Sequence, residues 1–171
     1  MKDNMLQIII IALAVAADQL TKFLLVPMLQ SLPGQTLTVI PGVFSLTYTG
    51  NTGASFGILA GAQPFFIAVT IIILIAGTVV MIRTRKKQSL FLKICLSLII
   101  GGAVGNFADR VTLGYVRDIF DFHAVYFPWI FNVADSCLVV GAILLGIYVI
   151  FIYKPKDKKA QMKEGKNPSE E

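Results

Sequence analysis

The amino-acid sequence predicts a mainly α-helical protein that crosses the membrane four times and carries a small extracytoplasmic β-sheet with an interfacial helix or loop. Apolar residues make up 56% of the 171-residue chain and charged residues 15%, against about 45–50% and about 25% in soluble domains. The mean hydropathy is +0.74. The apolar residues also gather in long blocks, as membrane spans require.

Four blocks approach the ~20 apolar residues that a helical span needs. They cover residues 5–25, 65–82, 90–107 and 134–153. The first block is long and does not end in a small-residue cleavage site, so we expect a retained span rather than a cleaved signal peptide. The predicted organisation is therefore one membrane domain at residues 1–153, with outer connections at residues 26–64 and 108–133. A basic tail follows at residues 154–171.

Lysine and arginine predict that both termini are cytoplasmic. Residues 83–87 hold four basic residues, the tail after Tyr153 holds six lysines, and residues 26–64 hold neither Lys nor Arg. Basic connections remain on the cytoplasmic side. The tail, which we expect to be disordered, then faces membrane lipids rather than nucleic acid.

The outer connections contain strand patterns and aromatic residues. Residues 44–49 alternate between apolar and polar types, which is typical of a half-buried strand. Residues 36–40 are a second strand candidate, with Pro41-Gly42 as the turn between them. The aromatic-rich segment 111–131 is expected to lie along the interface as a short helix or loop.

Unusual polar residues lie near the outer ends of the spans. Asp18 and Lys22 are four residues apart on one helix face and can pair, although Lys22 can alternatively extend outward to the interface. Asn106 is placed to reach Asp109 and Arg110, three and four residues further along. The simpler interpretation is an interfacial helix end with an Asp109–Arg110 charge pair.

More polar groups fall on the same side of the membrane. Asn132 and Asp135 open the last span, where a helix N-cap explains one of them and leaves the other unexplained. Asp118 and Asp121 lie in the aromatic connection, and the residues alone do not choose between them. Asn51 brings a further amide from the first outer connection. Several independent segments thus contribute to one outer site.

Paired carboxyl groups are the chemistry that this inventory favours. A catalytic serine needs a base, and few bases lie on the outer side. His123 is the single histidine, and Cys95 and Cys137 lie in apolar blocks, which disfavours a zinc site or a disulfide. Two nearby aspartates share one proton. The ionised member then takes a proton from water and the protonated one polarises a carbonyl, so we predict no metal and no cofactor.

Five motifs occur in the order and spacing of a known family. They are Asp18-Gln19-Leu20-Thr21-Lys22, Asn51-Thr52-Gly53-Ala54-Ser55-Phe56, Gly105-Asn106-Phe107-Ala108-Asp109-Arg110, Val116-Arg117-Asp118-Ile119-Phe120-Asp121 and Phe131-Asn132-Val133-Ala134-Asp135. In these the chain resembles the lipoprotein signal peptidase (signal peptidase II) family. Each motif is weak by itself, but five in order on a four-span chain are specific.

The resemblance implies an intramembrane aspartyl endopeptidase. Such an enzyme removes the signal peptide from prolipoproteins, just before a cysteine that carries diacylglycerol, on the outer side of the bacterial cytoplasmic membrane. With this resemblance we also expect a monomer. The resemblance also implies that Asp118 and Asp135 are the catalytic pair. The implied substrate-binding and supporting residues are Asn51, Gly53, Asn106, Arg110, Asn132, Asp18, Lys22 and Asp109.

Arg117 departs from the family pattern, which usually has an apolar residue there. A cation beside Asp118 would lower the carboxyl pKa if it pointed inward; we expect it to point to lipid phosphates instead. Two other classes of protein remain as alternatives. An ion- or proton-coupled carrier requires polar groups in both leaflets or an inverted repeat, and a non-catalytic assembly subunit would tolerate loss of either aspartate.

Overall fold

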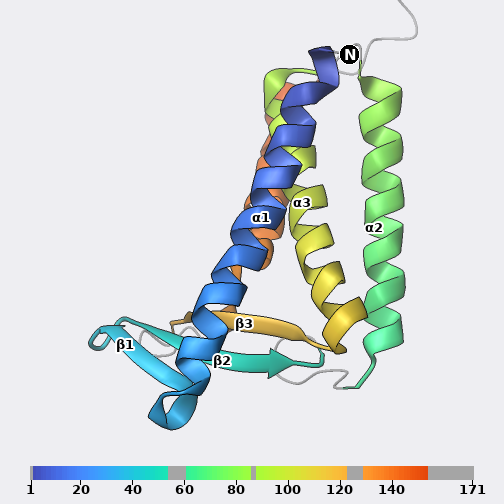
Figure 1. Cartoon of the computed structure of the whole chain (residues 1–171). Helices are drawn as coiled ribbons and strands as arrows, with labels where there is room; N and C mark the ends of the chain where they lie inside the picture. The colour runs from blue at the N-terminus through green and yellow to red at the C-terminus, as the bar shows by residue number, and fades with distance from the viewer. Residues whose placement is uncertain (1, 54–60, 86–87, 123–128, 154–171) are drawn as a thin grey trace, which may run out of the picture.

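A computed structural model of the chain describes residues 2–53, 61–85, 88–122 and 129–153. In these ranges four long helices run side by side and a small sheet lies across one end of them (Figure 1). The helices are α1 (Lys2–Gln30), α2 (Gln63–Thr84), α3 (Leu90–Leu113) and α4 (Val133–Ile147), the last extended by a π-helical turn (Tyr148–Ile152). All four are long and apolar enough to cross a membrane, which confirms the predicted spans. The predicted tail lies outside the described residues.

Helix ends follow from local capping and from burial. α3 begins after Ser89, whose side chain accepts a hydrogen bond from the Leu92 N–H, and ends at Gly114 with a left-handed φ of 87°. α1 extends beyond its predicted end, through Pro27 to Gln30. Its last turns bury Val26 and Leu29 against the sheet, so packing outweighs the helix-breaking tendency of proline.

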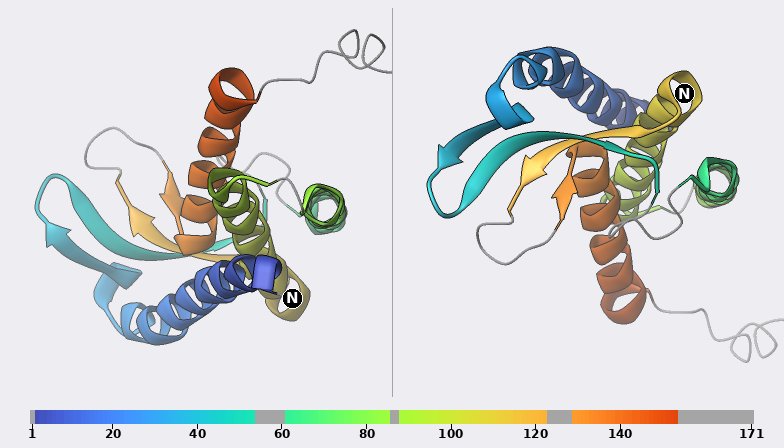
Figure 2. Two further views of the ribbon diagram at one scale, coloured as in Figure 1. Left: turned by 90° about the horizontal axis from the view of Figure 1, so that it is seen from above. Right: turned by 90° about the horizontal axis from the view of Figure 1, so that it is seen from below.

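α3 is the central helix and packs against the other three. Its glycines permit close contact with the neighbouring helices. A Cβ atom on Gly101 would lie 2.7 Å from the Ala14 Cβ of α1, and one on Gly102 would lie 2.4 Å from the Ala134 carbonyl oxygen of α4. α2 packs mainly on α3 and stands apart from α1 and α4 when viewed along the bundle (Figure 2).

The sheet has four antiparallel strands within the described residues, in the order β1-β2-β3-β4. β1 (Thr36–Ile40) and β2 (Phe44–Asn51) confirm the two predicted strands. Gly42 adopts a φ of 73° in the turn between them. β3 (Val116–Asp121) and β4 (Ile130–Phe131) complete the sheet.

The second outer connection differs from the expected interfacial helix or loop. Residues 116–121 pair with β2 as β3, and residues 123–128 lie outside the described part of the chain. The reason is that β2 offers a free edge and that the aromatic side chains pack on one another. Phe122 stacks on Phe131 at 5.7 Å between ring centroids and contacts Phe44 at 4.7 Å.

Candidate active site

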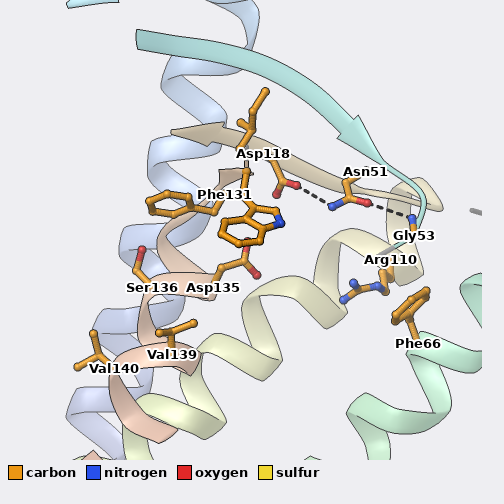
Figure 3. A pocket seen from close by; sticks show the side chains of 12 residues that line it. Asn51, Gly53, Phe66, Arg110, Asp118, Phe131, Asp135, Ser136, Val139 and Val140 are labelled. Atoms are coloured by element: carbon orange, nitrogen blue, oxygen red, sulfur yellow. Dashed lines mark hydrogen bonds between the residues drawn. The ribbon is translucent and has the colours of Figure 1, made fainter. Parts of the chain in front are cut away.

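Two aspartates from separate elements line one cleft at the sheet end of the bundle (Figure 3). Asp118 extends from β3, and Asp135 lies in the first turn of α4. The cleft has a volume of about 600 Å³. Its remaining walls are Asn51, Gly53, Phe66, Arg110, Trp129, Ile130, Phe131, Ser136, Val139 and Val140.

Asn132 connects the two carboxyl groups. Its Oδ1 accepts a hydrogen bond from the Asp135 N–H at 2.8 Å, and its own N–H donates to Asp135 Oδ2 at 3.2 Å. This reciprocal pair caps α4. The Asn132 Nδ2 also donates to Asp118 Oδ1 at 2.7 Å. The side chain therefore caps the helix, as predicted, and also bridges the aspartates.

Each of the four carboxylate oxygens accepts a hydrogen bond. Asn51 Nδ2 donates to Asp118 Oδ2 at 2.9 Å, and its own Oδ1 accepts from the Gly53 N–H at 3.0 Å. Asn106 Nδ2 donates to Asp135 Oδ1 at 2.6 Å. The expectation that Asn106 reaches Asp109 and Arg110 was wrong, because its side chain turns across to α4, where a buried carboxylate needs a donor.

Burial changes the acidity of Asp118, which is 2% exposed. Desolvation, followed by the nearby Asp135 charge, raises the pKa of Asp118 to about 7. The hydrogen bonds from Asn51 and Asn132 act in the opposite direction. Because the two carboxyl groups interact, the pKa belongs to the pair, which therefore retains a proton up to near-neutral pH.

A buried ionic cluster lies behind the cleft. Lys22 Nζ is 2.8 Å from Asp18 Oδ2 and 3.1 Å from Asp109 Oδ2, and all three residues are 0% exposed. This confirms the predicted Asp18–Lys22 pair and contradicts an outward-extending Lys22. Asp18 Oδ1 also accepts from the Ala134 N–H at 3.0 Å, which attaches α1 to the start of α4.

Arg117 points inward, so the expectation that it meets lipid phosphates was wrong. Its Nη2 lies 2.7 Å from Asp109 Oδ1, and this hydrogen bond raises the pKa of Arg117. Two neighbouring cations offset the desolvation cost of a buried carboxylate better than one cation does. In the described structure Asp109 therefore pairs with Lys22 and Arg117. The expected pair of Asp109 with Arg110 does not form.

Arg110 instead faces the cleft. Its guanidinium carbon lies 5.3 Å from the centre of the Phe66 ring on α2, a cation–π distance. Gln63 Nε2 donates to the Arg110 carbonyl at 2.7 Å, which joins α2 to α3 beside the cleft. Arg110 thus presents the cleft with a positive charge near the two aspartates.

The structure separates Asp118 from Asp121, which the residues alone left open. Asp121 is three positions further along β3 and therefore points to the other face of the strand. Its Oδ2 accepts a hydrogen bond from Thr47 Oγ1 at 2.8 Å, and it is absent from the described lining of the cleft. Asp118 alone of the two faces Asp135.

Sequence reasoning missed Gln19. Its Nε2 donates to Asp18 Oδ2, to the Gly105 carbonyl and to Asp109 Oδ1, at 3.0, 3.1 and 3.1 Å. Its Oε1 accepts from Arg117 Nη2 at 2.9 Å. The available signal was an uncharged amide inside an apolar helix, which is costly unless it is hydrogen-bonded.

The donor set around the aspartates suits carboxyl chemistry better than metal binding. Amide and backbone N–H groups point at the carboxylate oxygens that a cation would use. Among the described residues, no group of three or more His, Cys, Asp or Glu side chains is placed to hold a metal ion. Cys95 and Cys137 are free thiols.

Comparisons with known proteins agree on one family. The family described as Signal peptidase (SPase) II matches residues 10–151. A lipoprotein signal peptidase of Enterococcus faecalis is 45% identical over 93% of this chain and 92% of its own length. One of Caldanaerobacter subterraneus is 46% identical over 84% and 95%. A solved bacterial membrane enzyme superposes with a TM-score of 0.72 at 36% identity, covering 94% of this chain and 93% of that one.

Proposed function

The chain belongs to the lipoprotein signal peptidase (signal peptidase II) family, and we propose that Asp118 and Asp135 are its catalytic pair. It is a membrane-bound aspartic peptidase that removes the signal peptide from prolipoproteins. The observation that carries the catalytic assignment is the pair of carboxyl groups, joined by Asn132, in one cleft. Cleavage of a purified lipidated precursor by variants of the two aspartates tests it.

In this proposal the pair works with one shared proton. The ionised carboxylate takes a proton from a water molecule, whose oxygen attacks the scissile carbonyl carbon. The protonated carboxyl group donates its proton to the carbonyl oxygen. When the tetrahedral intermediate collapses, the C–N bond breaks, the departing nitrogen receives a proton from the pair, and one hydroxyl group of the intermediate returns its proton to the pair as the new carbonyl forms. Asn51, Asn106 and Asn132 orient the carboxyl groups throughout.

The cleft also suggests how a substrate lies. Val139 and Val140 form its apolar wall along α4, while Asn51, Asp118 and Arg110 form its polar part toward the sheet. We infer that the apolar wall receives the signal helix and that the cleaved bond lies beside a diacylglyceryl-modified cysteine at the membrane surface. We further propose that the protein acts as a monomer and that the exposed apolar side chains of its spans contact membrane lipids directly.

Orientation follows from the basic residues. The described Arg83 and Arg85 lie at the end of α2 that is remote from the sheet. Basic segments favour the cytoplasmic side. We therefore place both termini in the cytoplasm and the catalytic cleft at the outer leaflet.

The pH dependence of cleavage follows from the shared proton. The pKa of Asp118 is raised to about 7, so the pair keeps a proton below that pH and loses it as the pH rises. We expect kcat/KM to fall as the pH rises above about 7, because the singly protonated pair is the active form. Measuring kcat/KM between pH 5 and pH 9 with a lipidated peptide checks this; a rate that keeps rising through the alkaline range contradicts it.

Asn51→Leu tests the amide that holds Asp118. The variant loses the donor to Asp118 Oδ2 and the acceptor for the Gly53 N–H. We expect kcat to fall by about 10- to 100-fold, the scale of a displaced catalytic group. Thr52→Val, at the neighbouring exposed position, is the matched control and should cleave at the parental rate. Equal cleavage rates for the two variants would contradict a role for Asn51 in orienting Asp118.

A further inference from the structure

Arg117 is bound more completely than a peripheral cation. Its Nη2 and Nε donate to the two oxygens of Asp109, at 2.7 and 3.2 Å. The Nη2 also donates to Gln19 Oε1 at 2.9 Å. A guanidinium held by both oxygens of one carboxylate has a fixed orientation that a lysine cannot reproduce.

The backbone of residue 117 is fixed as well. Its N–H donates to Asp109 Oδ2 at 3.0 Å, and its carbonyl accepts from Asn132 Nδ2 at 3.4 Å. The same Asn132 Nδ2 donates to Asp118. Because side chains alternate along a strand, Arg117 points toward the helices, and the next residue, Asp118, points into the cleft.

The cluster is also balanced in charge. Lys22 contacts Asp18 and Asp109, and Arg117 contacts Asp109, so two cations compensate two carboxylates. The Arg117 side chain is 18% exposed, whereas the other three are 0 to 1% exposed. Arg117 is thus the outermost member, and it joins the strand that carries Asp118 to α1 and α3.

We propose that Arg117 is a positioning residue for the peptidase: by clamping Asp109 it sets the place of β3 on the helices and thereby the approach of Asp118 to Asp135. This inference rests on the proposed catalytic role of the two aspartates. The ladder with β2 does a different job: it pairs Thr49 with Asp118 and Gly50 with Arg117 and so fixes β3 to β2, whereas the Arg117–Asp109 clamp fixes β3 to the helices.

The experiment compares Arg117→Met and Arg117→Lys with the parent protein in lipid nanodiscs, using a diacylglyceryl-modified precursor peptide. We expect Arg117→Met to lower kcat by about 10- to 100-fold with KM within about twofold, since a misplacement of about 1 Å has that effect. Arg117→Lys should recover little, because it restores a charge and not the clamp. Arg83→Met, an exposed site remote from the cleft, should keep the parental kcat.

A second measurement separates positioning from stability. Rates are taken well below each variant's Tm, so that a purely stabilising role lowers Tm and leaves kcat unchanged. If Arg117 acts through Asp109, Arg117→Met changes kcat much less in the Asp109→Asn variant than it does in the parent protein. An unchanged kcat in Arg117→Met, or full recovery in Arg117→Lys, overturns the inference. If Asp118→Asn is inactive in the same assay, the proposed function still stands.

Discussion

Replacing Asp118 by asparagine is expected to abolish signal-peptide cleavage while the protein still folds and inserts. Asparagine has the same shape and retains an oxygen that can accept from Asn132. Its amide nitrogen can neither accept the proton of water nor release one to the carbonyl. We expect kcat to fall by about 10⁴-fold, the upper range for general acid–base catalysis, measured as single-turnover cleavage of a lipidated precursor.

Asp135→Asn should have the same effect, because the two carboxyl groups act as one unit. Asp121→Asn is the matched control on the same strand. Asp121 binds Thr47 and is absent from the described lining of the cleft. The Asp121→Asn variant should therefore cleave the precursor at close to the parental rate. Cleavage by either Asp118→Asn or Asp135→Asn at the rate of Asp121→Asn would contradict the catalytic assignment and favour a non-catalytic membrane protein.

Gly102→Ala is expected to destabilise the protein and to displace the catalytic helix. The added Cβ would lie 2.4 Å from the Ala134 carbonyl oxygen and 2.9 Å from Leu138 Cγ. Alanine favours a helix over glycine by about 1 kcal/mol, but overpacking against backbone costs about 3 kcal/mol, so destabilisation wins. Because Ala134 adjoins Asp135, the shift of α4 should also lower kcat.

Gly146→Ala is the control for that substitution. It lies near the opposite end of α4 from Ala134, and nothing is within 4 Å of its Cβ position. The helix propensity then acts alone, and the Tm in detergent should be unchanged or slightly raised. Equal Tm values for Gly102→Ala and Gly146→Ala would show that α3 and α4 tolerate a wider separation than the structure indicates.

Much of the fold was predictable because hydrophobicity alone specifies it. Span length and composition identify all four long helices of the described chain, and the alternation in residues 44–49 identified β2. The outer clustering of rare polar residues also located the cleft. The choice of Asp118 over Asp121 came from the family resemblance, and the geometry separates them because they point to opposite faces of β3.

The remaining features depend on partners that are distant in the sequence. Asn106 turns away from its own helix to Asp135, 29 residues further along. Arg117 binds Asp109 and Gln19, the latter 98 residues away. Local spacing favours nearby pairs and lipid contacts for such residues. Only the packing of α1, α3 and β3 creates the buried charge that draws Arg117 inward.

The central claim is that Asp118 and Asp135 share one proton, and infrared difference spectroscopy of the carboxyl groups tests it most directly. We expect a protonated carboxyl band in the parent protein that disappears as the pH rises through about 7. In Asp135→Asn the same loss should occur at lower pH, because the Asp135 charge contributes to the raised pKa of Asp118. An unchanged midpoint in Asp135→Asn, or no such band in the parent protein, would contradict it.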